Sequence, residues 1–333
     1  NFAFKECSAL SHVTFAKNIK IKTLLVGTFM ECTSLESIEI PASILEIPDA
    51  DEDIASYDRN DGLFEGCTSL RLVTFAEGSK CARIGAHAFD GTAIESITIP
   101  ETVSDIGDYA FAYTSLVNVT IPNTVTSLGT GAFESCKSLA TVTLGNGIRE
   151  ILDNVFSNCP SLRELTLPAS VTTVESGAFY NDDNLTLKLA PDSRMNLVKG
   201  VLYDASWVIN YFPESITEYE IPRKVSQLPE DFFDSYYGIA KQLTSITVEE
   251  GNTAYVSENG VLYTADKSTV LFFNASVTTF ELTAAILENA TDDLFTALNA
   301  APALVSVTVA DDVSAYVSVG GVLYTKDWDM KVI

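Results

Sequence analysis

The sequence predicts a solenoid of about twelve stacked coils that share a parallel β-sheet. The first reason is an internal repeat: residues 84–100 read IGAHAFDGTAIESITIP, and residues 106–122 read IGDYAFAYTSLVNVTIP. The second is that a phenylalanine recurs every 22 or 23 residues from Phe89 to Phe179. A stacked array grows by adding coils, so the length of 333 residues does not indicate several globular domains.

Each coil contains one short strand with the pattern L-x-x-V-x-F or a close variant. The fourth and sixth positions are apolar and the fifth is polar, which indicates a sheet buried on one face. Every copy runs in the same direction, so we expect parallel pairing. A proline often follows and ends the strand, because it lacks an amide donor. The copies occupy residues 10–15, 35–40, 70–75, 94–99, 116–121, 139–144, 162–167, 185–189, 216–221, 243–248, 277–282 and 304–309.

Between strands the chain reads V-x-x-I-G-x-x-A-F, as in residues 103–111 and 125–133. We expect this phenylalanine to anchor each coil in the interior, carried on a tight turn or a single helical turn. Gly85, Gly107 and Gly129 mark the bend before it. At these positions either a side chain would be too crowded or the backbone needs a positive φ.

Five of the six cysteines share one repeat position, three residues after a repeat phenylalanine: Cys7, Cys32, Cys67, Cys136 and Cys159. Thr92 and Thr114 fill the same position in two other coils. A disulfide needs a cysteine at both ends, whereas threonine replaces cysteine here. We therefore expect unpaired thiols buried in the core.

An acidic insertion at about residues 45–62 lengthens the interval from Phe29 to Phe64 to 35 residues. The alternation of Asp49, Asp51 and Asp53 is similar to a calcium-binding loop, but Ile54 stands where an EF-hand has glycine and Asn60 where it has glutamate. The sequence favours a solvated loop, with a weak extracellular calcium site as the alternative.

The organisation changes after residue 189, so we divide the chain into a regular array at 1–189 and a continuing array at 190–333. The tetrapeptide GVLY occurs at 200–203, 260–263 and 321–324. A second apolar run follows at 208–212 and again at 270–273, which predicts a β-hairpin added every two coils. Residues 228–243 and 284–301 are rich in helix formers and predict longer helices.

Composition excludes several classes of function. The chain carries 45 acidic and 20 basic residues, a formal net charge of −25, which disfavours nucleic acids and anionic lipid surfaces as partners. Apolar residues make up 47% of the chain, too many for disorder, and no apolar run is long enough to cross a membrane. The chain begins within a repeat, so we expect the natural start to lie upstream.

Catalytic chemistry has little support in the sequence. The only histidines are His12 and His87, and Cys81 near His87 is a weak candidate for a cysteine–histidine pair. The cysteines occur once per coil rather than in the clusters that zinc needs. No nucleotide-binding or nucleophile-elbow motif occurs in a suitable context. We expect no enzyme activity, no cofactor and no metal within this chain.

The best candidate site is the polar face of the strands. Threonine fills the fifth strand position in eight copies, which suits an exposed strand by itself, because stacked threonines stabilise a sheet. The functional alternative is a broad binding surface for a protein or glycan. Its predicted residues lie at the third and fifth strand positions: Ser96, Thr98, Asn118, Thr120, Thr141, Thr143, Glu164 and Thr166. The C-terminal hairpins are the second choice.

The strand pattern ending in proline, the V-x-x-I-G-x-x-A-F-x-x-C-x-S-L segment and the GVLY hairpins together resemble the BspA-like, or Treponema pallidum-type, leucine-rich repeat family. The resemblance covers essentially the whole chain. It implies a right-handed leucine-rich repeat solenoid with a concave parallel sheet and short convex helical turns.

The resemblance also implies export to a cell surface and binding of host or bacterial proteins, as in adhesins. From the residues themselves we expect a monomer that binds an extracellular protein or glycan. Two alternatives remain. The chain could be a stalk or spacer that presents another module, or part of a larger hydrolase whose catalytic domain lies outside it.

Overall fold

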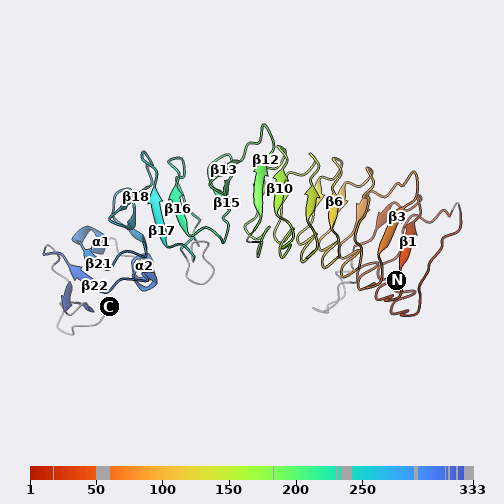
Figure 1. Cartoon of the computed structure of the whole chain (residues 1–333), viewed down its shortest axis with the longest axis horizontal. Helices are drawn as coiled ribbons and strands as arrows, with labels where there is room; N and C mark the ends of the chain where they lie inside the picture. Colours follow the sequence, from red (N-terminus) through yellow and green to blue (C-terminus); the bar gives the residue numbers. More distant parts are fainter. Residues whose placement is uncertain are drawn as a thin grey trace. The chain divides into compact units, whose positions relative to one another are not determined.

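The computed structural model describes residues 1–17, 19–49, 61–182, 184–229, 232–233, 242–288, 292–311, 313, 316–319 and 322–325. The chain forms two compact units, Asn1–Ala205 and Ser206–Ile333, and each is described by itself (Figure 1). No helix among the described residues has the length and hydropathy needed to cross a bilayer.

The first unit stacks its coils through short parallel strands, as the sequence predicts. Strand β1 pairs with β3, β6 with β8, and β10 with β12, all in parallel. Apolar and polar side chains alternate, so that Val119 and Leu165 are buried while the residues on either side of them are exposed. We call the exposed side of these strands the strand face. The six strands are β1 Ser37–Ile40, β3 Leu72–Phe75, β6 Asn118–Thr120, β8 Thr141–Thr143, β10 Glu164–Leu167 and β12 Thr186–Leu189.

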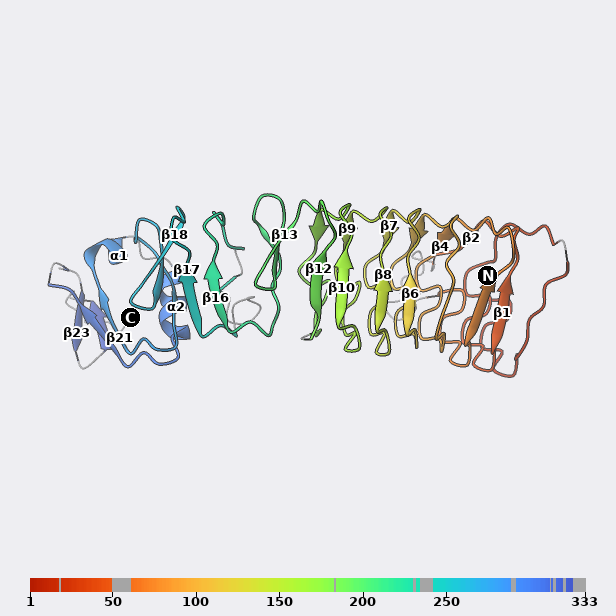
Figure 2. The ribbon, with the colours of Figure 1, turned by 45° about the horizontal axis from the view of Figure 1, so that its top comes forward.

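A second ladder of two-residue strands runs along another side of the same coils, and the sequence analysis did not predict it (Figure 2). It lies immediately before the glycine of the I-G motif, where Ile84, Ile106 and Leu128 point into the core. Each coil is therefore tied to its neighbours on two sides. The strands are β2 Glu46–Ile47, β4 Arg83–Ile84, β5 Asp105–Ile106 and β7 Ser127–Leu128 in one sheet, with β9 Glu150–Ile151 and β11 Thr173–Val174 in another.

The repeat phenylalanines form a continuous ring stack through the first unit. Adjacent ring centroids lie 5.3 to 6.1 Å apart, and the ring planes are within 16° of parallel. This confirms the predicted core anchor. The rings sit on consecutive tight turns, and no helix occurs among the described residues of this unit. The residue two positions after each phenylalanine has a positive φ throughout: Glu6, Glu31, Gly66, Gly91, Tyr113, Ser135, Asn158 and Asn181.

The glycines of the I-G motif are explained by crowding. A Cβ atom on Gly107 would lie 2.6 Å from the backbone nitrogen of Ala86, and one on Gly129 would lie 2.4 Å from that of Asp108. Neither glycine has a positive φ. At Gly107 and Gly129 the backbones of successive coils therefore approach too closely for a side chain.

Five cysteines are buried free thiols, and four of them bind the preceding coil. Their Sγ atoms donate to the carbonyl oxygen of the phenylalanine one coil earlier, at 3.0 Å from Cys67 to Phe29 and 3.1 Å from Cys136 to Phe111. Cys7 is exposed, which corrects the expectation that it is buried.

Thiol reactivity tests this arrangement. Burial raises the pKa of Cys67 to about 12 and that of Cys136 to about 11, and it also raises the pKa values of Cys32, Cys81 and Cys159. Because the thiolate is the reactive form, we expect Ellman's reagent to label about one thiol per native chain, namely Cys7. All six should react in guanidinium chloride. Rapid labelling of most thiols in the native protein would contradict the burial.

The acidic insertion leaves the coil stack intact. Phe29 and Phe64 stack directly at 5.5 Å although the insertion separates them in the sequence. At its entrance, the Oδ1 atom of Asp49 accepts hydrogen bonds from Arg83 at 2.7 Å and from the amide of Ala86 at 2.9 Å. The expected solvated loop or calcium site falls mostly on residues 50–60, which lie outside the described residues.

The second unit continues the parallel pairing, with β16 Glu218–Ile221 beside β17 Ser245–Val248 and β21 Thr279–Leu282 beside β22 Ser306–Val309. The helix expected at 284–301 is present as α1 Ala284–Glu288 and α2 Asp292–Ala300. Most of the other expected helix, at 228–243, falls outside the described residues.

The GVLY segments form antiparallel strands, as predicted. Strand β19 Val261–Thr264 pairs with β20 Val270–Phe273. It also pairs with β18 Tyr255–Glu258, which the sequence analysis missed. The turn between β18 and β19 is Asn259-Gly260 with φ values of 51° and 81°, the dipeptide typical of tight hairpins. The other strands of this kind are β13 Asn196–Val198, β14 Val201–Tyr203, β15 Ile209–Tyr211, β23 Tyr316–Val319 and β24 Val322–Thr325.

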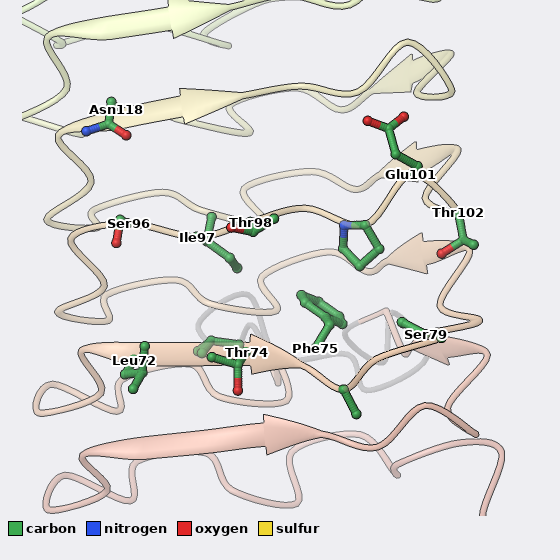
Figure 3. Close-up of a pocket in the computed structure, with 14 residues that line it drawn as sticks. Leu72, Thr74, Phe75, Ser79, Ser96, Ile97, Thr98, Glu101, Thr102 and Asn118 are labelled. Carbon is green, nitrogen blue, oxygen red and sulfur yellow. The ribbon is translucent and has the colours of Figure 1, made fainter.

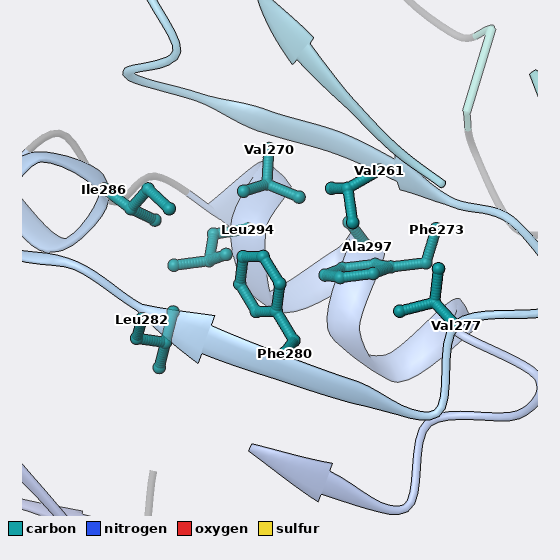
Figure 4. Packing of buried hydrophobic residues seen from close by; sticks show 9 residues of the cluster. All are labelled: Val261, Val270, Phe273, Val277, Phe280, Leu282, Ile286, Leu294 and Ala297. Atoms are coloured by element: carbon teal, nitrogen blue, oxygen red, sulfur yellow. The ribbon is translucent and has the colours of Figure 1, made fainter. Parts of the chain in front are cut away.

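A separate apolar cluster joins hairpin, strand and helix in the second unit (Figure 4). Phe273 of β20 and Phe280 of β21 meet edge to face at 4.8 Å. Leu294 and Ala297 of α2 pack against the same cluster. The hairpin is thus part of the core of this unit.

Candidate functional site on the strand face

All eight predicted site residues are exposed on the strand face of the first unit. Four of them are in register on neighbouring strands, because Asn118 is the Cα partner of Thr141, and Thr120 that of Thr143. Thr166 lies opposite Lys188 of β12, and the Nζ atom of Lys188 is 2.6 Å from the Oε2 atom of Glu164. The sequence analysis did not include Lys188. Glu164 is therefore part of an ion pair between β10 and β12.

The strand ladder is interrupted between β8 and β10, which belong to different sheets, and also in the coil between β3 and β6. There it shrinks to a single parallel bridge between Leu72 and Ser96, and residues 97–99 belong to no named strand. A hollow of about 630 Å³ opens on the strand face at this break (Figure 3). We call it the β3 hollow. Its lining residues are Leu72, Val73, Thr74, Phe75, Ala76, Gly78, Ser79, Ser96, Ile97, Thr98, Pro100, Glu101, Thr102 and Asn118.

The break coincides with an unusually large residue. The sixth strand position is isoleucine or leucine in the neighbouring coils, and Ile40, Ile99 and Ile121 are all at most 5% exposed. In β3 this position holds Phe75, which is only half-buried. Ile97 is also half-buried, whereas the equivalent residues of the six named strands are buried. Figure 3 shows Phe75 and Ile97 in the space between the two coils, where they form the apolar part of the hollow.

Three of the predicted site residues, Ser96, Thr98 and Asn118, come together in the β3 hollow. The other five lie along the strand face outside it. Sequence analysis missed Phe75, Ser79, Glu101 and Thr102 as lining residues. The available signal was the aromatic residue at a strand position that is aliphatic in the adjoining copies.

The β3 hollow contains no positive charge. None of its fourteen lining residues, all of them described, is basic, and Glu101 is the single charged member. Arg71, next to the hollow in sequence, pairs with Glu95 at 3.1 Å, with both side chains more than 60% exposed. Such an exposed pair contributes little stability. The hollow therefore presents hydroxyl, amide and apolar groups beside one carboxylate.

Neither candidate catalytic residue, His87 or Cys81, lines this site, although the backbone of Cys81 bonds to Ser79 and Thr102, which do. The Nδ1 atom of His87 is 2.9 Å from the Oδ2 atom of Asp90, and its ring stacks on Tyr109 at 5.0 Å. The Sγ atom of Cys81 donates to the carbonyl oxygen of Arg83 at 3.2 Å. Within the described part of the chain, no group of three or more His, Cys, Asp or Glu side chains is arranged to hold a metal ion.

A cluster of acidic groups surrounds Glu65 on the phenylalanine turns. Burial raises the pKa of Glu65 to about 7, partly offset by the Gly62 amide, which donates to its Oε2 atom at 3.0 Å. Asp90 and Asp61 raise this pKa further, while His87 lowers it. Asp61 is 2% exposed and lies 3.6 Å from Lys5. We interpret the cluster as a feature that makes stability depend on pH.

Glu65 should make the first unit less stable as the pH rises. Its pKa of about 7 in the folded state lies above the ordinary glutamate value of 4.5, so ionisation disfavours the folded state. The resulting loss in the free energy of unfolding is absent below about pH 4.5 and complete above about pH 7. We expect Glu65→Gln to melt at the same temperature as the parent at pH 4.5 and at a higher temperature at pH 8. Equal melting temperatures at pH 8 would contradict the raised pKa.

Comparisons with known proteins agree with this architecture. The short parallel strands, stacked coil on coil with a phenylalanine core, define a leucine-rich repeat solenoid. Six copies of the BspA type leucine-rich repeat region match residues 1–50 and 59–186, more than half of the chain. The chain therefore belongs to the BspA-type leucine-rich repeat family. A comparison with curated protein sequences gives no match.

Two solved structures share the fold. A leucine-rich repeat protein from Bacteroides ovatus is 21% identical with a TM-score of 0.53, over 91% of this chain and 68% of that protein. A leucine rich cell surface protein from Faecalibacterium prausnitzii is 22% identical with a TM-score of 0.50, over 84% of this chain and 80% of that protein. At this identity the similarity establishes the fold alone.

Proposed function

We propose that the chain is a non-catalytic, exported scaffold at a cell surface and that it binds an extracellular protein or glycan through the strand face, in the manner of an adhesin. The cell-surface description of the Faecalibacterium prausnitzii protein, which has the same fold, supports the location. Membership of a repeat family supports the absence of catalysis, because solenoids of this kind use an extended face for binding.

The β3 hollow carries this proposal. It is a recess in the strand face, and it brings together Ser96, Thr98 and Asn118 with the half-buried Phe75. A regular threonine row stabilises the sheet without any ligand, whereas a recess with apolar and hydrogen-bonding groups is the usual form of a binding site. The net charge of −25 favours neutral or basic partners.

Introducing positive charges on the strand face tests the proposal. The full chain and a variant with Thr98, Thr120, Thr143 and Thr166 changed to arginine are measured against immobilised extracellular-matrix proteins, mucins and glycans. We expect the variant to lose at least about tenfold in affinity for whichever probe binds the parent, because four long charged side chains cover the strand face.

A matched control separates the site from the charge change. Thr124, Thr126, Thr172 and Thr173 are exposed and lie off the strand face. Their replacement by arginine adds the same charge and should leave binding within about twofold, provided that both variants keep the parent circular dichroism spectrum. Equal loss of binding in both variants would refute a role for the strand face.

A structural role as a stalk is the second candidate, and the ring stack supports it. Eight phenylalanines from Phe4 to Phe179 stack without interruption, which ties the coils of the first unit into one continuous core. This candidate predicts that no probe of the panel binds the parent chain at micromolar concentration. Specific binding that the strand-face variant abolishes would exclude a purely structural role.

A further inference from the structure

The two coils that flank the β3 hollow pair with each other at both of its ends, which limits what can insert between them. At one end Leu72 and Ser96 form the parallel bridge. At the other end the Oγ1 atom of Thr102 donates to the carbonyl oxygen of Cys81 at 2.7 Å, and the coils pair again through β4 and β5. A peptide strand added to a sheet needs an open edge along its whole length. The hollow is therefore suited to a compact group rather than to a chain that runs through it.

The lining has an apolar side and a polar rim. Phe75 and Ile97 supply half-buried apolar surface between the coils, while Ser96, Thr98 and Asn118 are exposed along the strands. A sugar ring has the complementary surfaces: C–H groups on its faces, which pack on an aromatic ring, and hydroxyl groups around its edge. A purely apolar side chain would leave the hydroxyl and amide groups of the rim without partners, at a cost in affinity.

The charge of the hollow selects among sugars. Recognition of a carboxylate, sulfate or phosphate relies on arginine, lysine or an array of amide donors. The lining contains no basic residue, and Glu101 would repel an anion. A neutral sugar meets no such repulsion, and a carboxylate such as Glu101 accepts hydrogen bonds from its hydroxyl groups. The size also fits, because about 630 Å³ lies within the roughly 300 to 1,000 Å³ of small-molecule sites.

We infer that the β3 hollow binds a neutral sugar residue of a glycan, with the ring packed on Phe75 and Ile97 and its hydroxyl groups bound by Ser96, Thr98 and Asn118. This inference rests on the proposed binding role of the strand face and names the chemistry of its ligand. Glu101 excludes acidic sugars from the same place.

Polymer-bound sugars provide the test. Lactose, mannose and N-acetylglucosamine conjugates are the neutral probes, and 3′-sialyllactose is the acidic counterpart of lactose. Biolayer interferometry with the full chain measures affinity, and saturation-transfer NMR identifies the ring protons in contact. We expect at least one neutral conjugate to bind and the sialylated form of lactose to bind about tenfold more weakly than lactose. Tighter binding of the sialylated form would overturn the inference.

Two variants and one control locate the site. Phe75→Leu introduces a residue that other coils carry at the same strand position and removes the aromatic ring, while Thr98→Val removes one hydroxyl at nearly constant shape. We expect Phe75→Leu to weaken sugar binding about tenfold and Thr98→Val about fivefold. Thr247→Val is the matched control, because Thr247 is an exposed threonine at the equivalent position of β17 in the other unit. It should leave binding within about twofold.

The outcomes separate this inference from the proposed function. Sugar binding that both hollow variants leave unchanged would overturn the inference. If matrix proteins bind, no sugar binds, and the strand-face arginine variant loses the protein binding, the sugar inference is wrong and the proposed binding function stands. Failure of every protein and sugar probe would refute both. If Phe75→Leu does not fold, the sugar affinity of Thr98→Val tests the inference by itself. The Thr98 side chain is exposed, so its replacement leaves the core unchanged.

Discussion

Replacing Phe111 by alanine is expected to lower the free energy of unfolding by about 3 to 5 kcal/mol. Its ring is fully buried and stacks at 5.3 Å on both Phe89 and Phe133. The truncation removes apolar contacts with two neighbouring coils and leaves a cavity that the closely tied backbones cannot fill. The loss should appear as a lower urea midpoint of the first unit.

The control for this prediction is Thr120→Ala, which changes an exposed side chain on the strand of the same coil. We expect a change of at most about 0.5 kcal/mol, as is usual for surface substitutions. A midpoint for Phe111→Ala that matches that of Thr120→Ala would contradict the role of the ring stack as the core of the coils.

Gly129→Ala is expected to cost about 3 kcal/mol, at the upper end of the range for overpacking. The new Cβ atom would lie 2.4 Å from the nitrogen of Asp108 and 2.5 Å from the carbonyl carbon of Gly107. These are backbone atoms of the preceding coil, so no side-chain rotation relieves the contact. The coils would have to separate where the Gly129 amide donates to the carbonyl oxygen of Ile106 at 2.8 Å. Thermal and urea unfolding measure the loss.

Gly78→Ala gives the comparison, because its glycine is required for a different reason. Gly78 has a φ of 73°, and a Cβ atom there would meet nothing within 4 Å. An alanine in this left-handed conformation costs about 1 to 2 kcal/mol from backbone strain alone. We therefore expect Gly129→Ala to be the more destabilising of the two. The reverse order would contradict the crowding between coils.

The strand face was predictable because its signal is local and repeated. The alternation at Val119-Thr120-Ile121 and its copies specifies which side chains enter the core, and the common direction of the copies specifies parallel pairing. The phenylalanine core was predictable for the same reason. Burial of Cys67, Cys136 and Cys159 followed from a position that they share with threonine.

The remaining features depend on contacts between coils that one copy of the repeat does not reveal. The second ladder has only two residues per strand, too few for an alternation to be recognised. The β3 hollow arises where Phe75 of one coil meets Ile97 of the next; the aromatic residue marks the position, but both residues keep the apolar pattern, so the hollow itself depends on the contact between coils. Strand β18 was not predicted although Asn259-Gly260 marks its turn, because the recurring GVLY motif starts only at Gly260 and leaves β18 outside it.

Hydrogen exchange on the chain bound to its strongest probe tests the central claim, that binding occurs on the strand face. Residues 97–99 belong to no named strand, so their amides should exchange readily in the free protein and report directly on an occupant of the hollow. The account predicts slower exchange in peptides that cover residues 72–79 and 95–102 when the probe is bound. Protection confined to the hairpin strands β18 to β20 would place the binding site in the second unit and contradict it.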